Sequence, residues 1–286
     1  MSNENFQYTP KLDPNYYIPN RFTNQTIIVT GGARGIGKAT AIRATREGAN
    51  VVIADRLKDL GEETTNQIIA EGGKAVFVHA DVSIPEQVLQ VVETTIQTFG
   101  ELHIGINNAG IIGNPSPVHL TSDETWNWVI ANNLTSVFLC CREQLKVMIQ
   151  QGLGGAIVNV SSIAGLTGLP GNPPYVASKH GVSGISRQIA LDYAKYGIRC
   201  NAICPSGTDT PMVEEAMQIV LKAQAASGDG TPDSGSMVLP GSKTQSMLKR
   251  NATAEEQAAS ILYYASEEAA HITGSVVATD GGWTAF

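Results

Sequence analysis

The chain has little positive charge and no long apolar run. Its 286 residues include 19 lysines and arginines against 26 acidic residues, which gives a net charge of −7. Surfaces that bind nucleic acid are usually basic, so this balance argues against a nucleic-acid partner. No stretch approaches the roughly 18 consecutive apolar residues of a membrane span, and no basic segment followed by an apolar run begins the chain. We therefore expect no membrane partner and a cytoplasmic location.

Cysteine is also scarce, and it does not occur in a metal-binding pattern. The one adjacent pair of cysteines lacks a second pair at zinc-site spacing, and the five histidines are scattered. The sequence thus predicts no metal site. It favours buried free thiols at all four cysteines, Cys140, Cys141, Cys200 and Cys204.

What the sequence does contain is typical of one ordered α/β domain. Apolar residues make up 42% of the chain and charged residues 16%, and no linker divides it into halves. A single doubly wound parallel sheet fits within this length and buries a large core. We expect residues 26–286 to form this domain and residues 1–25, which mix tyrosines with prolines and polar residues, to form an N-terminal arm.

The sequence places three reactive side chains on one strand-to-helix connection. Residues 156–162 are apolar and β-branched, which predicts a buried strand that ends at Ser162. Two consecutive prolines then favour a helix start just before Tyr175. Tyr175 and Lys179 are four positions apart and share a helix face, where the ammonium can lower the pKa of the phenol. The pattern predicts a proton-transfer site.

A glycine-rich segment lies between a predicted strand at residues 26–29 and a helical pattern. Glycines there let the backbone turn tightly and approach a pyrophosphate at the helix N-terminus. A second predicted strand, residues 50–54, ends at a carboxylate that can accept hydrogen bonds from an adenosine ribose. The sequence therefore predicts a dinucleotide site that includes Gly31, Gly35, Gly37 and Asp55.

From about residue 26 to its end, the chain resembles the short-chain dehydrogenase/reductase family, in its single-domain branch. The resemblance rests on the T-G-x-x-x-G-x-G turn at residues 30–37, the Y-x-x-x-K pair at residues 175–179 with its upstream serine, and the N-A-G turn at residues 108–110. It implies a Rossmann-type fold. It also implies cofactor contacts from a larger set: Arg34, Ile36, Asp81, Val82, Asn108, Ala109, Gly110, Thr208 and Thr210, together with Tyr175 and Lys179.

One segment departs from the family pattern. The family usually has Pro-Gly after the sixth strand, whereas this chain has Pro-Ser-Gly at residues 205–207. The turn that flanks the nicotinamide is therefore expected to differ slightly from that of the family.

The resemblance further implies hydride transfer between a carbinol carbon and a nicotinamide ring. Tyr175 is then the acid/base and Ser162 the hydrogen-bond donor to the substrate oxygen. Lys179 lowers the pKa of Tyr175 and binds the nicotinamide ribose, while Asn133 holds a water that links this lysine to solvent. A non-catalytic dinucleotide-binding regulator is the alternative from another class of protein, but all four of these residues are present.

The choice between the two nicotinamide cofactors depends on charge near the adenosine ribose. The carboxylate of Asp55 repels the 2′-phosphate of NADP, whereas Arg34 or Arg56 can attract it. We expect NAD as the cofactor, with an NADPH-dependent carbonyl or 3-oxoacyl reductase as the alternative function.

The substrate is predicted from the apolar residues of one variable segment, and the assembly mainly from the resemblance. Residues 213–250 fall where family members have a variable lid, although a surface loop with a small core of its own is an equal alternative. The apolar residues of this segment favour an uncharged secondary alcohol, a ring diol or the matching ketone. The family commonly pairs the helices expected here at residues 121–150 and 175–196, which implies a homotetramer.

Overall fold

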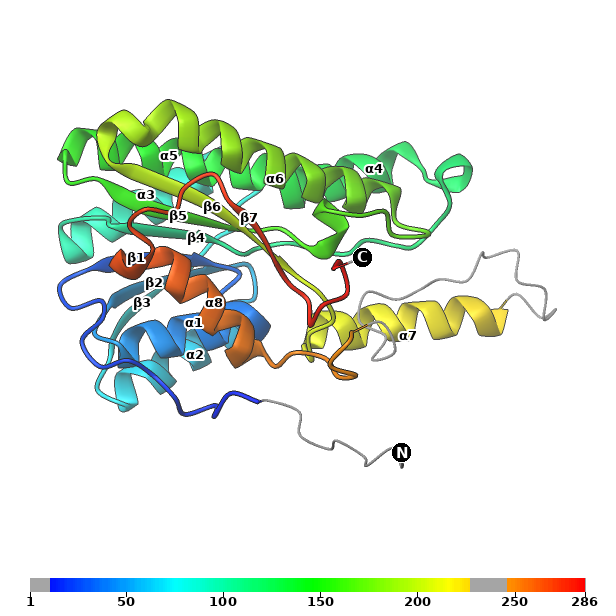
Figure 1. Ribbon diagram of the computed structural model, residues 1–286, viewed down its shortest axis with the longest axis horizontal. Helices are drawn as coiled ribbons and strands as arrows, with labels where there is room; N and C mark the ends of the chain where they lie inside the picture. Colours follow the sequence, from blue (N-terminus) through cyan, green and yellow to red (C-terminus); the bar gives the residue numbers. More distant parts are fainter. Residues whose placement is uncertain (1–10, 227–245, 286) are drawn as a thin grey trace, which may run out of the picture.

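A seven-stranded parallel sheet forms the centre of the computed structural model, which describes residues 11–226 and 246–285 (Figure 1). The strand order is β3-β2-β1-β4-β5-β6-β7, and every neighbouring pair is parallel. The predicted doubly wound α/β class is confirmed. The strands are β1 (Thr26–Thr30), β2 (Asn50–Asp55), β3 (Lys74–His79), β4 (Ile104–Asn107), β5 (Gly155–Val160), β6 (Ile198–Pro205) and β7 (Val276–Thr279).

Helices cover both faces of the sheet. One face packs against α1, α2 and α8, and the opposite face against α3, α5 and α6 (Figure 1). Helix α4 precedes α5, and α7 lies beyond the carboxyl ends of the strands. The bounds are α1 (Gly35–Arg46), α2 (Lys58–Ala70), α3 (Pro85–Phe99), α4 (Asp123–Ile130), α5 (Ser136–Gln151), α6 (Pro173–Tyr193), α7 (Pro211–Ala226) and α8 (Ala254–Ala265).

The central strands are apolar at consecutive positions because both faces of the sheet are buried. In β1, Ile27 and Val29 point into the core beneath α1, whereas Ile28 points into the core beneath α3 and α5. All three side chains are at most 1% exposed. A parallel sheet enclosed by crossover helices requires this continuous apolar pattern, which is why these strands were recognisable in the sequence.

The predicted strand at residues 156–162 is shorter in the structure. Strand β5 ends at Val160, and Ser162 instead begins a short 3-10 helix over Ile163–Gly165. The Ser162 hydroxyl accepts a hydrogen bond from the Ala164 N–H at 3.1 Å. Serine often caps a helix in this way, so the reactive hydroxyl lies in the turn that follows the strand and not in the strand itself.

The part of the N-terminal segment that the structure describes, residues 11–25, packs against α1 and α8. Phe22 is fully buried in the core, and Arg21 donates from Nε to Glu47 at 2.7 Å. Farther along, the Leu12 N–H donates to Glu256 of α8 at 3.3 Å. Residues 11–25 are therefore held by the domain, while residues 1–10 lie outside the described part.

The segment expected to form a lid is described only in part. Its first half belongs to α7, and residues 227–245 lie outside the described residues. The chain returns at residues 246–252, where Ala252 pairs with Thr208 in an isolated bridge. Among the described residues, no helix is long and apolar enough to cross a membrane. All four cysteines are buried and free, as the sequence predicted.

The sheet changes winding direction between β1 and β4. These strands are neighbours in space, but the chain leaves β1 toward α1 on one face and β4 toward α4 and α5 on the other (Figure 1). Diverging connections leave a crevice at the carboxyl ends of such strands, where α/β proteins bind ligands. Many of the predicted site residues come directly after the carboxyl ends of the strands, at this edge of the sheet.

Candidate active site

Two glycines of the turn after β1, Gly31 and Gly37, leave no room for a side chain. A Cβ atom on Gly37 would lie 2.0 Å from the Gly31 carbonyl oxygen and 2.6 Å from Nδ2 of Asn108. Gly31 and Gly35 have φ angles of 66° and 57°, which favour glycine. Helix α1 begins at Gly35 with neither a side-chain cap nor an acidic residue in its first turn. Its first N–H groups are thus left for an anion, and the turn fits a pyrophosphate.

Asp55 is fixed at the end of β2 by two backbone donors. Its Oδ2 accepts from the Ala33 N–H and its Oδ1 from the Leu57 N–H, both at 3.0 Å. The side chain is largely buried yet lines the same cavity as the glycine turn. Each carboxylate oxygen keeps a further lone pair, so the group can accept hydrogen bonds from a ribose placed there.

The Asn-Ala-Gly turn after β4 is tied to β1. The N–H groups of Asn108 and Ala109 both donate to Oγ1 of Thr30, at 3.0 and 3.1 Å. Nδ2 of Asn108 donates to the carbonyl oxygens of Thr30 and Gly31, both at 3.1 Å. These bonds hold the two strand ends in one register. A Cβ on Gly110 would come within 3.5 Å of Nζ of Lys179, so this turn passes directly over the lysine.

The structure brings Ser162, Tyr175 and Lys179 together at the end of β5. All three are buried, with Tyr175 only 8% and Lys179 only 4% exposed. Nζ of Lys179 lies 5.7 Å from the centre of the Tyr175 ring and donates to the Val160 carbonyl at 2.9 Å. Helix α6 starts at Pro173 as predicted, so the spacing of four residues does place both side chains on one face.

The pKa of Tyr175 does not follow the expected direction. Burial raises the pKa of the phenol, and a hydrogen bond with Ser162 only partly opposes this rise. The same burial lowers the pKa of Lys179 to about 8. Loss of hydration disfavours the charged form of either group, and in Tyr175 this cost outweighs every opposing contact. In this structure the ammonium does not make Tyr175 more acidic.

Asn133 lies in a π-helical turn, Ala131–Thr135, between α4 and α5. Both the oxygen and the nitrogen of its side-chain amide form hydrogen bonds. Oδ1 accepts from the Ile111 N–H and Nδ2 donates to the Ile111 carbonyl, both at 2.8 Å. Nδ2 also donates to Oγ of Ser178 at 3.2 Å. The side chain therefore fixes the segment after the Asn-Ala-Gly turn against α6, and its predicted role in holding a water stays a prediction.

Comparisons with known proteins agree with this geometry. A family model described as enoyl-(acyl carrier protein) reductase matches residues 31–284. A 3beta-hydroxysteroid dehydrogenase of Mediterraneibacter gnavus is 46% identical over 94% of this chain and 98% of its own length. The chain belongs to the short-chain dehydrogenase/reductase family. As in the family at large, its chemistry is that of a short-chain NAD(P)-dependent oxidoreductase.

Two further relatives of this short-chain dehydrogenase/reductase cover most of its length. A cyclohexanol dehydrogenase of an Acinetobacter species is 35% identical over 93% of this chain and 98% of the relative. The crystal structure of levodione reductase superposes with a TM-score of 0.83 at 33% identity, covering 92% of this chain and 99% of the other. The predicted family and fold are thus confirmed together.

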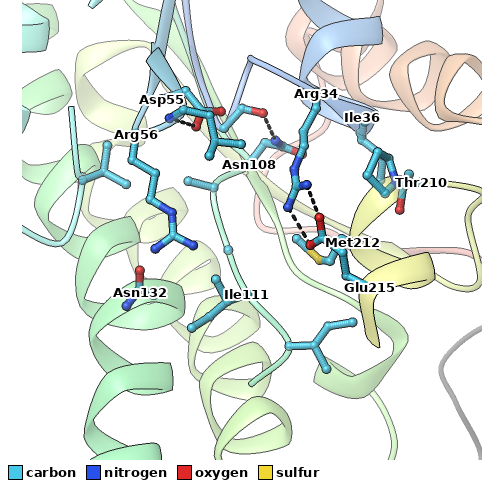
Figure 2. Close-up of a pocket in the computed structure, with 18 of the residues that line it drawn as sticks. Arg34, Ile36, Asp55, Arg56, Asn108, Ile111, Asn132, Thr210, Met212 and Glu215 are labelled. Carbon is cyan, nitrogen blue, oxygen red and sulfur yellow. Dashed lines mark hydrogen bonds and ion pairs between the residues drawn. The ribbon is translucent and has the colours of Figure 1, made fainter. Parts of the chain in front are cut away.

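A cavity of about 280 Å³ lies along the glycine turn and the ends of β2 and β4, where the cofactor of this short-chain dehydrogenase/reductase is predicted to bind (Figure 2). Most of the predicted cofactor residues line it: Gly31, Arg34, Gly35, Ile36, Asp55, Asp81, Val82, Asn108, Ala109, Gly110 and Thr210. Gly37 lies within the turn itself. Thr208 is buried and donates to the Ser206 carbonyl at 3.0 Å, so it supports the chain after β6 and does not face the cavity.

The cavity does not reach the proton-transfer residues. Tyr175 belongs to an apolar cluster with Ile112, Leu169 and Ala216, the last of which is on α7. The cavity walls also include residues that sequence reasoning missed, notably Trp128, Asn132, Met212 and Glu215. No local sequence pattern identifies these residues as part of the cavity. Glu215, for example, binds Arg34, which is 181 positions away in the chain.

Proposed function

We propose that the protein is an NAD-dependent dehydrogenase that oxidises an uncharged secondary ring alcohol or diol, or reduces the matching ketone. The observation that carries this proposal is the convergence of Ser162, Tyr175 and Lys179 at the end of β5, next to the glycine turn. Acid–base side chains beside a dinucleotide cradle are the arrangement that hydride transfer to and from an alcohol needs.

The three side chains divide the work of moving the proton. A bound nicotinamide would supply the hydride chemistry of this reaction, to or from the carbon that carries the substrate oxygen. Tyr175 accepts the hydroxyl proton at Oη in oxidation and returns it in reduction. Ser162 donates its hydroxyl hydrogen to the substrate oxygen, where charge develops. Lys179 keeps two N–H donors beyond its bond to Val160, and these suit the ribose hydroxyls and the phenolate.

The carboxylate of Asp55 supports NAD as the cofactor. Its fixed position at the end of β2 suits the 2′- and 3′-hydroxyls of an adenosine ribose, and it would repel a 2′-phosphate there. The opposite preference is favoured by Arg56, which lines the same cavity and points across it toward Asn132 (Figure 2). An NADPH-dependent carbonyl or 3-oxoacyl reductase is therefore the second candidate.

The substrate class rests on the apolar wall of the cavity and on the relatives. Ile111, Ile112 and Met212 line the cavity, and Leu169 packs beside Tyr175. Among the described lining residues the cations are Arg34 and Arg56, near the ribose end. The names of three relatives specify ring alcohols: a 3beta-hydroxysteroid, cyclohexanol and a dichlorocyclohexadiene diol. We infer a ring alcohol without a carboxylate or phosphate.

The first test is a panel of ring alcohols with NAD and NADP, followed by absorbance of the reduced nicotinamide. We expect turnover of cyclohexanol, a cyclohexanediol or a 3β-hydroxysteroid, with NAD preferred. Tyr175→Phe should lower kcat by about a hundredfold to ten-thousandfold, because only the ionisable oxygen is lost. NAD binding and the unfolding temperature should stay unchanged. Near-normal turnover in Tyr175→Phe would exclude this tyrosine as the acid/base.

The second test is the pH dependence of alcohol oxidation. Burial raises the pKa of the Tyr175 phenol, which must be ionised to accept the alcohol proton. The rate of oxidation should therefore rise with pH across the whole range below that raised pKa, and ketone reduction, which needs the protonated phenol, should fall only above it.

Lys179→Met provides the control for this profile. In this structure the ammonium does not lower the pKa of Tyr175, so the variant should keep the alkaline rise at the same pH, while its affinity for NAD falls because donors to the ribose are lost. A deuterated alcohol shows whether hydride transfer limits the rate. An oxidation rate that is independent of pH between about 6 and 10, with a full isotope effect, would contradict phenolate catalysis.

The third test concerns Asp55. Asp55→Ser removes the repulsive carboxylate and its ribose contacts, so kcat/KM for NADP should rise relative to NAD by about tenfold or more. Two unit charges 4 Å apart interact by about 4 kcal/mol at an effective dielectric of about 20, before solvent screening. A wild type that already prefers NADP, or an unchanged ratio in the variant, would move the reductase to first place.

We also infer that the protein forms a homotetramer. Helices α4, α5 and α6 each expose a large apolar side chain, Trp126, Phe138 and Leu191 respectively. Leu191 is 78% exposed. Single exposed apolar residues are common, but three on adjoining helices support an interface.

The fourth test is light scattering at micromolar concentrations. We expect four times the mass of the chain, and Leu191→Asp should weaken the assembly because it places a charge in the interface. Tyr16→Asp, at an exposed position outside these helices, is the matched control. A monomeric wild type would overturn the inference.

A further inference from the structure

An ion pair between Arg34 and Glu215 joins the glycine turn to α7. Both guanidinium Nη atoms donate to the carboxylate, Nη1 to Oε1 and Nη2 to Oε2, the latter at 2.9 Å. This two-point contact is the strongest geometry available between these groups. Arg34 is also the residue directly before α1, so its side chain belongs to the same turn as the pyrophosphate cradle.

Arg34 lies between two carboxylates and points toward only one of them. Figure 2 shows its guanidinium directed away from Asp55 and toward Glu215. All three residues line one cavity. The hydrogen bond to Glu215 raises the pKa of Arg34 more than any other contact, and the charge of Asp55 adds to the rise. The reverse effect lowers the pKa of Glu215, so both members of the pair are ionised.

The contact uses the atoms that a phosphate would need. Arginine binds phosphate and carboxylate with the same fork of N–H donors, so the two anions compete for Nη1 and Nη2. The charge of Glu215 also acts on Arg56, the second cation near the ribose end of the cavity. The negative charge of Glu215 therefore interacts with both arginines that could attract a 2′-phosphate.

We propose that Glu215 is a specificity-determining residue that favours NAD by withholding Arg34 from a 2′-phosphate. The proposal rests on the proposed preference for NAD and adds to the action of Asp55. Asp55 repels the phosphate where it would bind, whereas Glu215 occupies the cation that would bind it. Glu215 is thus a positioning residue, which acts on the cofactor through Arg34.

The expected change in cofactor preference depends on how far the Arg34–Glu215 ion pair is exposed to water. The side chains of Arg34 and Glu215 are 33% and 57% exposed, so water screens the pair and the two-point geometry only partly compensates. We expect Glu215→Gln to change cofactor preference by about three- to tenfold. This is less than the change expected for Asp55, which is largely buried. The effect should be clearest after Asp55→Ser, when the repulsion near the ribose is gone.

The test compares ligands that differ only in the 2′-phosphate. Calorimetry with the full chain gives the affinities for adenosine 2′,5′-bisphosphate and for AMP, and kinetics give kcat/KM for NADP and NAD. Glu215→Gln should raise both ratios in favour of the phosphorylated ligand. Glu214→Gln is the matched control, because Glu214 carries the same charge on the same helix and forms no ion pair with any described residue. It should leave both ratios unchanged.

Arg34→Ala decides whether the effect passes through the arginine. In the Arg34→Ala background, Glu215→Gln should no longer change the preference for the bisphosphate. A general displacement of α7 would instead alter the affinities for AMP and the bisphosphate alike. The proposal is wrong if Glu215→Gln leaves the ratio unchanged, or if it raises the ratio equally without Arg34. A wild type that prefers the bisphosphate contradicts the proposed NAD preference, while the change between variants still decides the role of Glu215.

Discussion

The site depends on the register between β1 and β4, the two strands at which the sheet changes winding direction. Four hydrogen bonds from Asn108 and Ala109 to Thr30 and Gly31 fix this register. The close approach of Gly37 to Gly31 leaves no space between the turn and the helix. A side chain at Gly37 would force α1 away from β1. The crevice, the free N–H groups of α1 and the position of Gly110 above Lys179 all follow from this packing.

Burial dominates the electrostatics of the proton-transfer residues. Tyr175 and Lys179 are enclosed by the sheet, the Asn-Ala-Gly turn and α7, and the loss of hydration shifts both groups toward their neutral forms. At neutral pH the phenol of Tyr175 is therefore protonated, whereas Lys179, with a pKa of about 8, still carries its charge. The same enclosure excludes water, which makes each later contact with substrate stronger.

Under the proposed preference for NAD, residues from distant parts of the chain would share the selection of the cofactor. Asp55 is rigid because two backbone N–H groups hold it, and its effect can be read from its place at a strand end. The effect of Arg34 cannot be read in this way. Its positive charge suggests affinity for a phosphate, but Glu215 on α7 already uses both of its terminal nitrogens.

The sequence by itself determined the class of fold, the glycine turn and the spacing that places Tyr175 and Lys179 on one helix face. Continuous apolar strands, glycines that allow one backbone path and a helical spacing of four are local patterns, and the structure keeps each of them. Tertiary structure alone decided the direction of the Tyr175 pKa shift, the place of Phe22 in the core and the partner of Arg34. Those properties depend on burial and on contacts between residues far apart in the chain, which no local pattern encodes.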